Sequence, residues 1–499
     1  PICTFCNCTS LTRIKSTLFA NNAYLETLGC SNSSNNQMTG SWSSYESENW
    51  GAFAKCTALT TLQAGLFDNN PLLQRMDWCF QGDYNLLSLP NDMFKYNTEL
   101  QYLCYTFGGC TGLTSLPADF LKYSDNIADV YKCFYNCNNL TALPTTLFAT
   151  DKEFTANNIS NIFENCSKLT AIPAHTFDSF TKITSATYTF SGCSLLSTLP
   201  ADLLKFCTVL QNVEGMFAYC SSLTTIPSTY FTYNNNITNI NWLFRNSGIQ
   251  ELQSGTFNPN WQLQNYLYGL FYGCSHLTTL PAKMFGDNPY ITQFQSATSG
   301  SSSDYYFNFR GCTSLTSLPV GLLDGLPNLT YICIFGYSSI QRLGKIFGDS
   351  STSTTRNITN FSYCFYNCDS LTEIESGVFD QFTNADNFGY TFYDNNNLYI
   401  IPDYLFANNT KVTNFQYTFY YDTHINEIPS HLFPDTQSGW GSQSSINFTG
   451  MFYAYNNAPT IGTVQDIWNI PGKSLTSSSC FRGRTNLTNY NDIPSNWKN

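Results

Sequence analysis

One motif recurs along the whole chain and constrains the fold more than any other feature. In its clearest form it reads Phe107-Gly-Gly-Cys110-Thr-Gly-Leu113-Thr114-Ser-Leu116-Pro117-Ala-Asp-Phe-Leu121. Its cysteine returns at Cys137, Cys166, Cys193 and Cys220, and three of these steps are 27 residues (137 − 110, 193 − 166 and 220 − 193). A fixed period of this size is typical of solenoids and other repeat arrays, and we count about 17 copies.

Each repeat carries two apolar patterns that predict its local structure. The Leu-Thr-x-Leu-Pro stretch is short and ends at proline, which is typical of a brief strand followed by a turn. A second pattern has spacings of three and four residues, as in Ile237, Ile240 and Phe244, and predicts helical turns. Strands of stacked repeats would lie about 4.8 Å apart in one parallel sheet. The sequence therefore predicts an α/β solenoid with a buried core that contains Phe107, Leu113, Leu116, Phe134, Leu140, Leu143, Phe163, Leu169 and Ile172.

The repeats predict one continuous solenoid over residues 1–499 rather than separate globular domains. We expect irregular or capping repeats over 1–70, regular repeats over 71–433, and irregular or capping repeats over 434–499. Insertions interrupt the period near residues 20–50, 293–308, 349–359 and 434–447. Insertions of this kind map to loops on one face, either as a binding face or simply as tolerated surface loops.

The repeat Phe-x-x-Cys-x-x-Leu-Thr-x-Leu-Pro-x-x-Leu-Phe resembles the leucine-rich repeats of BspA-like surface proteins of bacteria and some protists. The resemblance covers nearly the whole chain. It implies a right-handed α/β horseshoe or coil that is exported and often adhesive. The period near 27 departs from the shortest versions of that repeat, which lie in the low twenties, so the resemblance does not fix the curvature.

Composition excludes several classes of partner. Hydrophobic residues make up 42% and charged residues only 11%, with a net charge of −12, which argues against nucleic acid and anionic membranes as partners. No run of about 18 apolar residues is present, so we expect no membrane span. Low charge with many neutral polar groups fits an extracellular or cell-surface protein. The chain begins at Pro1, so the lack of a signal segment says nothing about export.

Most of the 20 cysteines are expected to be reduced, even in an exported chain. Ten occupy one repeat position, where other copies have Ser, Asn or Asp, so the position requires a small hydrogen-bonding residue. Side chains about 4.8 Å apart on adjacent rungs also exceed the Cβ separation of a disulfide, which is about 3.8 Å. Cys3, Cys6 and Cys8 crowd the N-terminus, where one disulfide, or a partner lost upstream, is an alternative.

The sequence predicts no enzyme, no cofactor and no metal site. The histidines His175, His276, His424 and His431 fall in different repeats, and no nucleophile or phosphate-loop motif is present. Acidic residues are scattered singly, which predicts solvated surface positions. The Asn-x-Ser/Thr pattern occurs about as often as chance predicts. Its candidate glycosylation sites include Asn32, Asn139, Asn236, Asn328, Asn357, Asn408 and Asn447.

Two patterns are candidates for binding. The first is a threonine that recurs at one repeat position, so that stacking would align these residues in a column. The column is either a hydroxyl-bearing binding face or simply a β-favouring residue at a half-exposed strand start. Its members include Thr114, Thr141, Thr170 and Thr224. Tyrosines are abundant at Tyr305-Tyr306, beside the mid-chain insertion, and at Tyr417, Tyr420 and Tyr421. Tyrosine offers a rigid contact area with a polar tip, or it simply covers the convex side of the solenoid.

Two functions remain open from these patterns. The first is a non-catalytic binding or adhesion module for a protein or a glycan. The second is a structural subunit of an extracellular fibre or surface layer, in which copies of the chain stack through their repeats.

Overall fold

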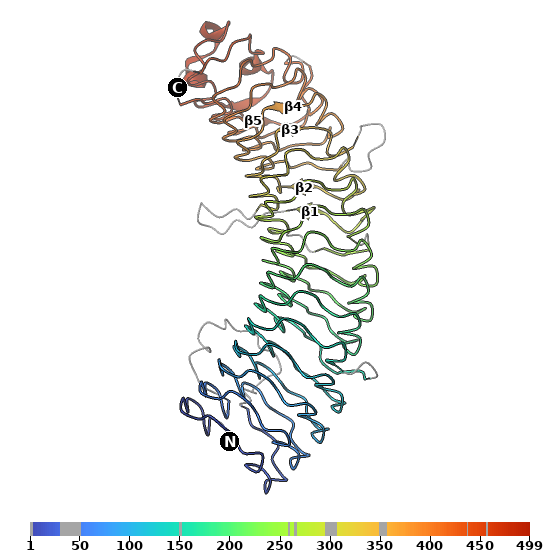
Figure 1. Cartoon of the computed structure of the whole chain (residues 1–499). Coiled ribbons are helices and arrows are strands. Elements are labelled where there is room, and N and C mark those ends of the chain that lie inside the picture. Colours follow the sequence, from blue (N-terminus) through green and yellow to red (C-terminus); the bar gives the residue numbers. More distant parts are fainter. Residues whose placement is uncertain are drawn as a thin grey trace. The chain divides into compact units, whose positions relative to one another are not determined.

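The computed structural model describes residues 3–29, 51–148, 152–257, 260–263, 267–294, 307–348, 357–436, 438–455 and 458–499. The chain divides into two compact units, Pro1–Gly248 and Ile249–Asn499. Within each unit, coils of the chain stack in sequence order, as the colour gradient shows (Figure 1). Each unit is thus a repeat solenoid, whereas the organisation as one continuous solenoid over 1–499 stays a prediction.

Among the described residues, regular secondary structure is sparse and lies in the second unit. Its strands are paired in parallel, β1 with β2, β3 with β4 and β5 with β6. The bounds are β1 Gln293–Phe294, β2 Tyr331–Ile332, β3 Arg342–Leu343, β4 Glu373–Ile374, β5 Ser445–Asn447 and β6 Ser474–Thr476. The helices of the described residues are single turns near the C-terminus, η2 Ile467–Asn469 between β5 and β6, and η3 Tyr490–Asp492 and α1 Ser495–Lys498 after β6.

Parallel pairing between coils occurs in two ladders rather than in the single sheet that we expected. In the first unit one ladder links Arg75 to Tyr102 and Tyr102 to Asp129. The other joins residues of the Leu-Thr-x-Leu stretch, such as Thr61 to Ser88. Most contacts are single-residue bridges, because turn residues lie within three positions on either side. The strand prediction is therefore right in position and too long in extent.

The prediction of helical turns from the second apolar pattern is wrong. The segment from Leu210 to Phe217 contains the bridge residue Asn212 and then Gly215 at φ 59°. A residue with positive φ ends a right-handed helix. Tyr219, four residues after Gly215, also has a positive φ, of 60°. The spacings of three and four residues instead mark successive tight turns whose apolar side chains all point into the coil.

Phenylalanine forms the centre of the core in both units. Phe107, Phe134 and Phe163 come from successive coils, and adjacent rings stack with centroids 5.8 Å apart. In the second unit Phe365 stacks on Phe392 at 5.5 Å, and Phe392 on Phe419 at 5.3 Å. All nine predicted core residues of the first unit are at most 7% exposed, which confirms that prediction.

Backbone hydrogen bonds between coils replace those of helices and sheets. The N–H of Phe107 donates to the carbonyl of Cys133 at 3.0 Å, and the N–H of Phe134 donates to that of Ile162 at 3.0 Å. Other N–H groups near Phe107 bond to the same neighbouring coil, for example that of Tyr105, which donates to the carbonyl of Tyr131 at 2.9 Å. Buried backbone groups need partners, and here each coil finds them on the next coil.

The cysteine column continues this bonding with side chains. The thiol of Cys110 donates to the carbonyl of Phe80 at 3.1 Å, and that of Cys193 to the carbonyl of Phe163 at 3.2 Å. Burial raises the pKa of the Cys166 thiol to about 12. The predicted reduced column is confirmed, and Cys3 and Cys6 form a disulfide, one of the alternatives that the sequence left open.

Asp83 and Asp422 occupy this column and are buried, which corrects the expectation that acidic residues lie on solvated surface. Asn395 shows what the position requires, because its Oδ1 accepts from the N–H of Cys368 and its Nδ2 donates to the carbonyl of Phe365. Asp83 accepts from the N–H of Cys56 through Oδ1, but its Oδ2 has no partner among described residues. A proton on Oδ2 would supply the missing donor, and burial raises the pKa of Asp83 to about 9.

We predict that Asp83→Asn removes part of the pH dependence of stability. Asp83 stays protonated in the folded state up to about pH 9, whereas the unfolded side chain ionises near its ordinary value of 3.8. The contribution of Asp83 to the unfolding free energy is therefore fully present below about pH 4. It falls by roughly 1.4 kcal/mol per pH unit up to about pH 9. In urea unfolding across this range, the unfolding free energy of the variant relative to that of the parent should increase as pH rises.

The exposed side chain of Asp68 supplies the matched control for this measurement, because Asp68→Asn also removes a carboxyl group but leaves the buried column unchanged. A free-energy difference between Asp83→Asn and the parent that does not change with pH contradicts the assignment of a buried neutral acid.

Candidate functional site

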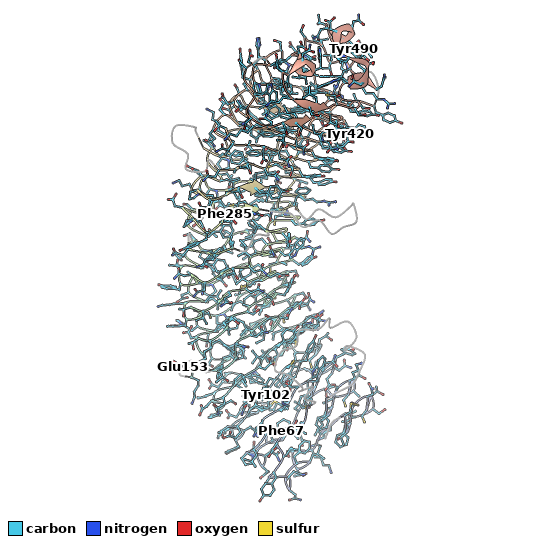
Figure 2. All side chains as sticks on the ribbon, turned by 180° about the vertical axis from the view of Figure 1, so that it is seen from behind. Phe67, Tyr102, Glu153, Phe285, Tyr420 and Tyr490 are labelled. Atoms are coloured by element: carbon cyan, nitrogen blue, oxygen red, sulfur yellow. A yellow bond between two sulfur atoms is a disulfide. The ribbon has the colours of Figure 1, made fainter. Side chains whose placement is uncertain are left out.

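A column of tyrosines runs across four successive coils of the second unit. Tyr366, Tyr393, Tyr420 and Tyr453 each follow the buried phenylalanine of their repeat, and all four are half-buried. Their rings stack in parallel, with centroid distances of 4.8 Å, 5.1 Å and 4.6 Å between successive members. Figure 2 labels Tyr420 among the side chains of this unit. We call these four residues the tyrosine ladder.

A second column lies three residues earlier in the same coils. Tyr363 stacks on Tyr390 with centroids 4.6 Å apart, and Tyr390 lies 5.0 Å from Tyr417 in a tilted arrangement. These three have positive φ angles of 60°, 59° and 56°. The ring centroids of Tyr421 and Tyr420 lie 4.2 Å apart, and Tyr455 beyond them is 74% exposed. The two columns together form a surface of phenol rings and hydroxyls.

The surface is close to neutral. Burial and neighbouring groups, chiefly Tyr421 and Asp394, raise the pKa of Tyr393 to about 12. Burial also raises the pKa of Asp394, whose carboxylate accepts hydrogen bonds from Asn367 at 2.9 Å and Asn396 at 2.8 Å. Arg482 lies over the ring of Tyr453 at 5.6 Å. The phenol of Tyr393 therefore remains protonated at neutral pH and offers a hydrogen bond without charge.

The sequence located only part of this surface. It singled out Tyr417, Tyr420 and Tyr421, and the structure brings all three together. It missed Tyr366, Tyr393 and Tyr453, although the Phe-Tyr doublet at the motif's phenylalanine is visible at Phe365-Tyr366, Phe392-Tyr393 and Phe452-Tyr453. Tyr305 and Tyr306 lie outside the described residues, so the site named there stays a prediction.

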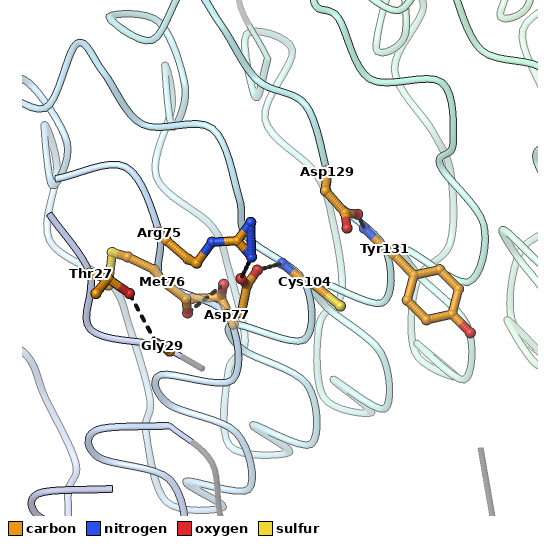
Figure 3. Close-up of polar contacts among 9 residues, drawn as sticks. Thr27, Gly29, Arg75, Met76, Asp77, Cys104, Asp129 and Tyr131 are labelled. Atoms are coloured by element: carbon orange, nitrogen blue, oxygen red, sulfur yellow. Dashed lines mark hydrogen bonds and ion pairs between the residues drawn. The ribbon is translucent and has the colours of Figure 1, made fainter. Parts of the chain in front are cut away.

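A charged cluster in the first unit was also missed. Arg75 Nη1 lies 2.8 Å from Asp77 Oδ2, and the Arg75 guanidinium lies 3.7 Å from the centre of the Tyr102 ring. Asp77 Oδ1 accepts from the N–H of Cys104 at 2.8 Å, and Asp129 accepts from the N–H of Tyr131 at 2.8 Å (Figure 3).

Burial raises the pKa of Asp77 to about 7, although the neighbouring Arg75 opposes this shift. Such a value would suit a general base. Both oxygens of Asp77 are nevertheless engaged by groups of the fold, and the side chain is 3% exposed. The cluster therefore joins coils rather than presenting a carboxylate to a substrate. Within the described ranges, no group of three His, Cys, Asp or Glu side chains is placed to hold a metal ion.

The predicted threonine face is exposed, but its hydroxyls are partly used by the fold. Thr114, Thr141, Thr170 and Thr224 are all exposed. The hydroxyl of Thr141 donates to the carbonyl of Thr114 at 3.3 Å, and that of Thr170 to the carbonyl of Thr141 at 3.5 Å. A binding role for this column stays a prediction, with fewer free donors than the sequence suggests.

Several candidate glycosylation sites have a structural role. Nδ2 of Asn139 donates to the carbonyl of Thr111 at 2.7 Å, one coil earlier. Asn236, Asn328 and Asn357 make the equivalent bond to Thr208, Pro289 and Pro327, and Asn447 donates to Gln416. Asn408 is exposed, and its side chain has no hydrogen-bond partner among described residues. Asn32 lies outside the described residues, and glycosylation at all of these positions stays a prediction.

Comparison with known proteins adds similar structures but no family assignment. No protein-family model matches the chain, and no curated protein matches it. A leucine-rich repeat protein from Bacteroides ovatus ATCC 8483 is 14% identical over 85% of each chain, with a TM-score of 0.33.

Two further solved structures are similar. A leucine rich cell surface protein from Faecalibacterium prausnitzii A2-165 is 16% identical over 66% of this chain and 82% of its own, with a TM-score of 0.22. A leucine-rich repeat protein from Eubacterium ventriosum ATCC 27560 is 13% identical over 80% of this chain and 82% of its own, with a TM-score of 0.25. Scores this low transfer neither a partner nor an activity, so the function has to be argued from this chain's own residues.

We predict that Asn139→Ala and Asn408→Ala differ in their effect on stability, although both remove a candidate acceptor. Asn139 loses its bond to Thr111 and a second bond from Lys168 at 2.7 Å, which should lower the unfolding free energy by about 1 kcal/mol. Asn408→Ala should change it by less than about 0.5 kcal/mol. Urea unfolding of the unglycosylated protein measures both, and equal effects would refute the structural role of Asn139.

Proposed function

We propose that this chain is an extracellular or cell-surface binding module without catalytic activity, of the BspA-like leucine-rich-repeat type, with about 17 repeats in a horseshoe or coil. Its ligand is a protein or a glycan. The observation that supports this proposal is the tyrosine surface of the second unit, where half-buried phenols stand in two columns across successive coils.

Two physical properties of this surface favour binding. The rings are held by their neighbours, so little side-chain entropy is lost when a ligand contacts them. The phenol side chains also carry hydroxyl groups, which suit the neutral hydroxyl and amide groups of glycans and protein surfaces. Charged residues are only 11% of the chain, so contacts of this kind rather than ion pairs would dominate an interface.

We predict that binding is insensitive to salt and depends on the ladder. Screening weakens charge pairs but leaves neutral hydrogen bonds and ring contacts largely intact, so affinity should change less than about threefold between low and high salt. Arrays of neutral glycans and of extracellular proteins, probed with the full chain, identify a ligand. Tyr393→Ala combined with Tyr420→Ala should then abolish its binding.

Tyr399 and Tyr404 provide the matched control, because both are exposed tyrosines of the same unit outside the ladder. Tyr399→Ala combined with Tyr404→Ala should bind as the parent does. Affinity that collapses with salt, or full binding by the ladder variant, would count against the proposal. Filaments of the full chain in electron micrographs would favour a fibre or surface-layer subunit instead.

A further inference from the structure

The stacked rings of the tyrosine ladder lie close enough to react with one another. Tyr366 and Tyr393 are 4.8 Å apart with an interplanar angle of 8°, and Tyr393 and Tyr420 are 5.1 Å apart with an angle of 12°. Tyr420 and Tyr453 are 4.6 Å apart with an angle of 14°. The backbone hydrogen bonds of adjacent coils hold this spacing, for example from the N–H of Phe392 to Thr418 at 2.9 Å.

Phenols have one reaction that depends on such proximity. A phenol that loses one electron and one proton becomes a phenoxyl radical, whose unpaired electron resides partly on the ring carbons ortho to the oxygen. Two phenoxyl radicals that meet form a carbon–carbon bond between these carbons. In solution the second radical must arrive by diffusion, whereas in the ladder a neighbouring ring is already present on the adjacent coil.

We propose that the tyrosine ladder is a site of oxidative tyrosine coupling, at which a haem peroxidase with hydrogen peroxide joins rings of adjacent coils through a carbon–carbon bond. Each of the two phenols gives up one electron and one proton, and hydrogen peroxide takes both electrons and both protons to form two molecules of water. After the bond forms, each ortho hydrogen moves to its oxygen, which restores both phenols. The product is a dityrosine cross-link within one chain.

The surroundings of the ladder suit this chemistry. All four side chains are half-buried, so each remains partly accessible to an oxidant while the ring faces stay in contact. Stacked rings must tilt before two ortho carbons can bond, and tilted pairs already occur beside the ladder. Tyr420 and Tyr421 lie 4.2 Å apart at 51°, and Tyr390 and Tyr417 lie 5.0 Å apart at 58°. The fold therefore accommodates the orientation that coupling requires.

Isolated tyrosines should behave differently. Tyr24 is 88% exposed, and Tyr404 stacks on His431 rather than on another phenol. A radical on either residue has to meet a second chain, so its coupling yield depends on protein concentration. Coupling in the ladder is intramolecular and should be independent of dilution. This difference separates the proposed site from the general reactivity of exposed tyrosine.

The test treats the full chain with a haem peroxidase and hydrogen peroxide at a low and a high protein concentration. Dityrosine fluorescence is measured in the monomer separated on a denaturing gel, and peptides joined with the loss of two hydrogens are mapped by mass spectrometry. We expect dityrosine in the monomer at both concentrations, with cross-links between Tyr366 and Tyr393, Tyr393 and Tyr420, or Tyr420 and Tyr453.

The central variant is Tyr393→Phe combined with Tyr420→Phe, which keeps the stacked rings but removes a phenol from every adjacent pair of the ladder. It should lose all ladder cross-links, while Tyr399→Phe combined with Tyr404→Phe should keep them. Near-ultraviolet circular dichroism confirms that both variants are folded. Dityrosine found only in covalent dimers, or monomer dityrosine of the parent that includes no cross-link between ladder residues, would overturn the proposal. Neither outcome bears on ligand binding, which is measured without an oxidant.

Discussion

Hydrogen bonds between the backbones of successive coils are the interaction on which the rest of the structure depends. Among the residues that the structure describes, helices and strands satisfy few backbone groups, so the N–H groups of Phe107 and Phe134 donate to carbonyls one coil later. These bonds fix the step between coils, and that step places each phenylalanine on the ring of the next. The same step spaces the surface tyrosines of the second unit at stacking distance, so the candidate site is a direct consequence of the core.

The same requirement explains the chemistry of the buried column. Its position needs a donor to the carbonyl of an earlier phenylalanine, and a thiol, an amide or a protonated carboxyl can provide one. Asp83 and Asp422 therefore act in their neutral form, and burial raises the pKa of both. The contribution of a buried acid of this kind to stability is largest at low pH, so it links the stability of each unit to proton uptake.

The recurring motif was sufficient to predict the period, the buried phenylalanines and leucines, and the reduced cysteines, because these depend on which residues occupy equivalent positions. It was not sufficient to predict the backbone path. The spacing of Leu210, Val213 and Phe217 fits a helix, and only Gly215 signals that the chain instead turns through positive φ. The Phe-Tyr doublets were visible, but the ladder depends on the distance between coils, which a sequence does not show. Arg75 and Asp77 were likewise unremarkable as sequence, and only the burial of Asp77 and its ion pair with Arg75 distinguish them.

Amide hydrogen exchange, resolved to single residues by NMR, tests most directly whether bonds between coils hold the fold. If they do, the N–H groups of Phe107, Phe134, Phe365 and Phe392 should exchange only when their whole unit unfolds, although none of them lies in a helix or strand. Their protection should then match the unfolding free energy of that unit. Rapid exchange at these four positions, with protection confined to β1–β6 and the terminal helices, would contradict the account.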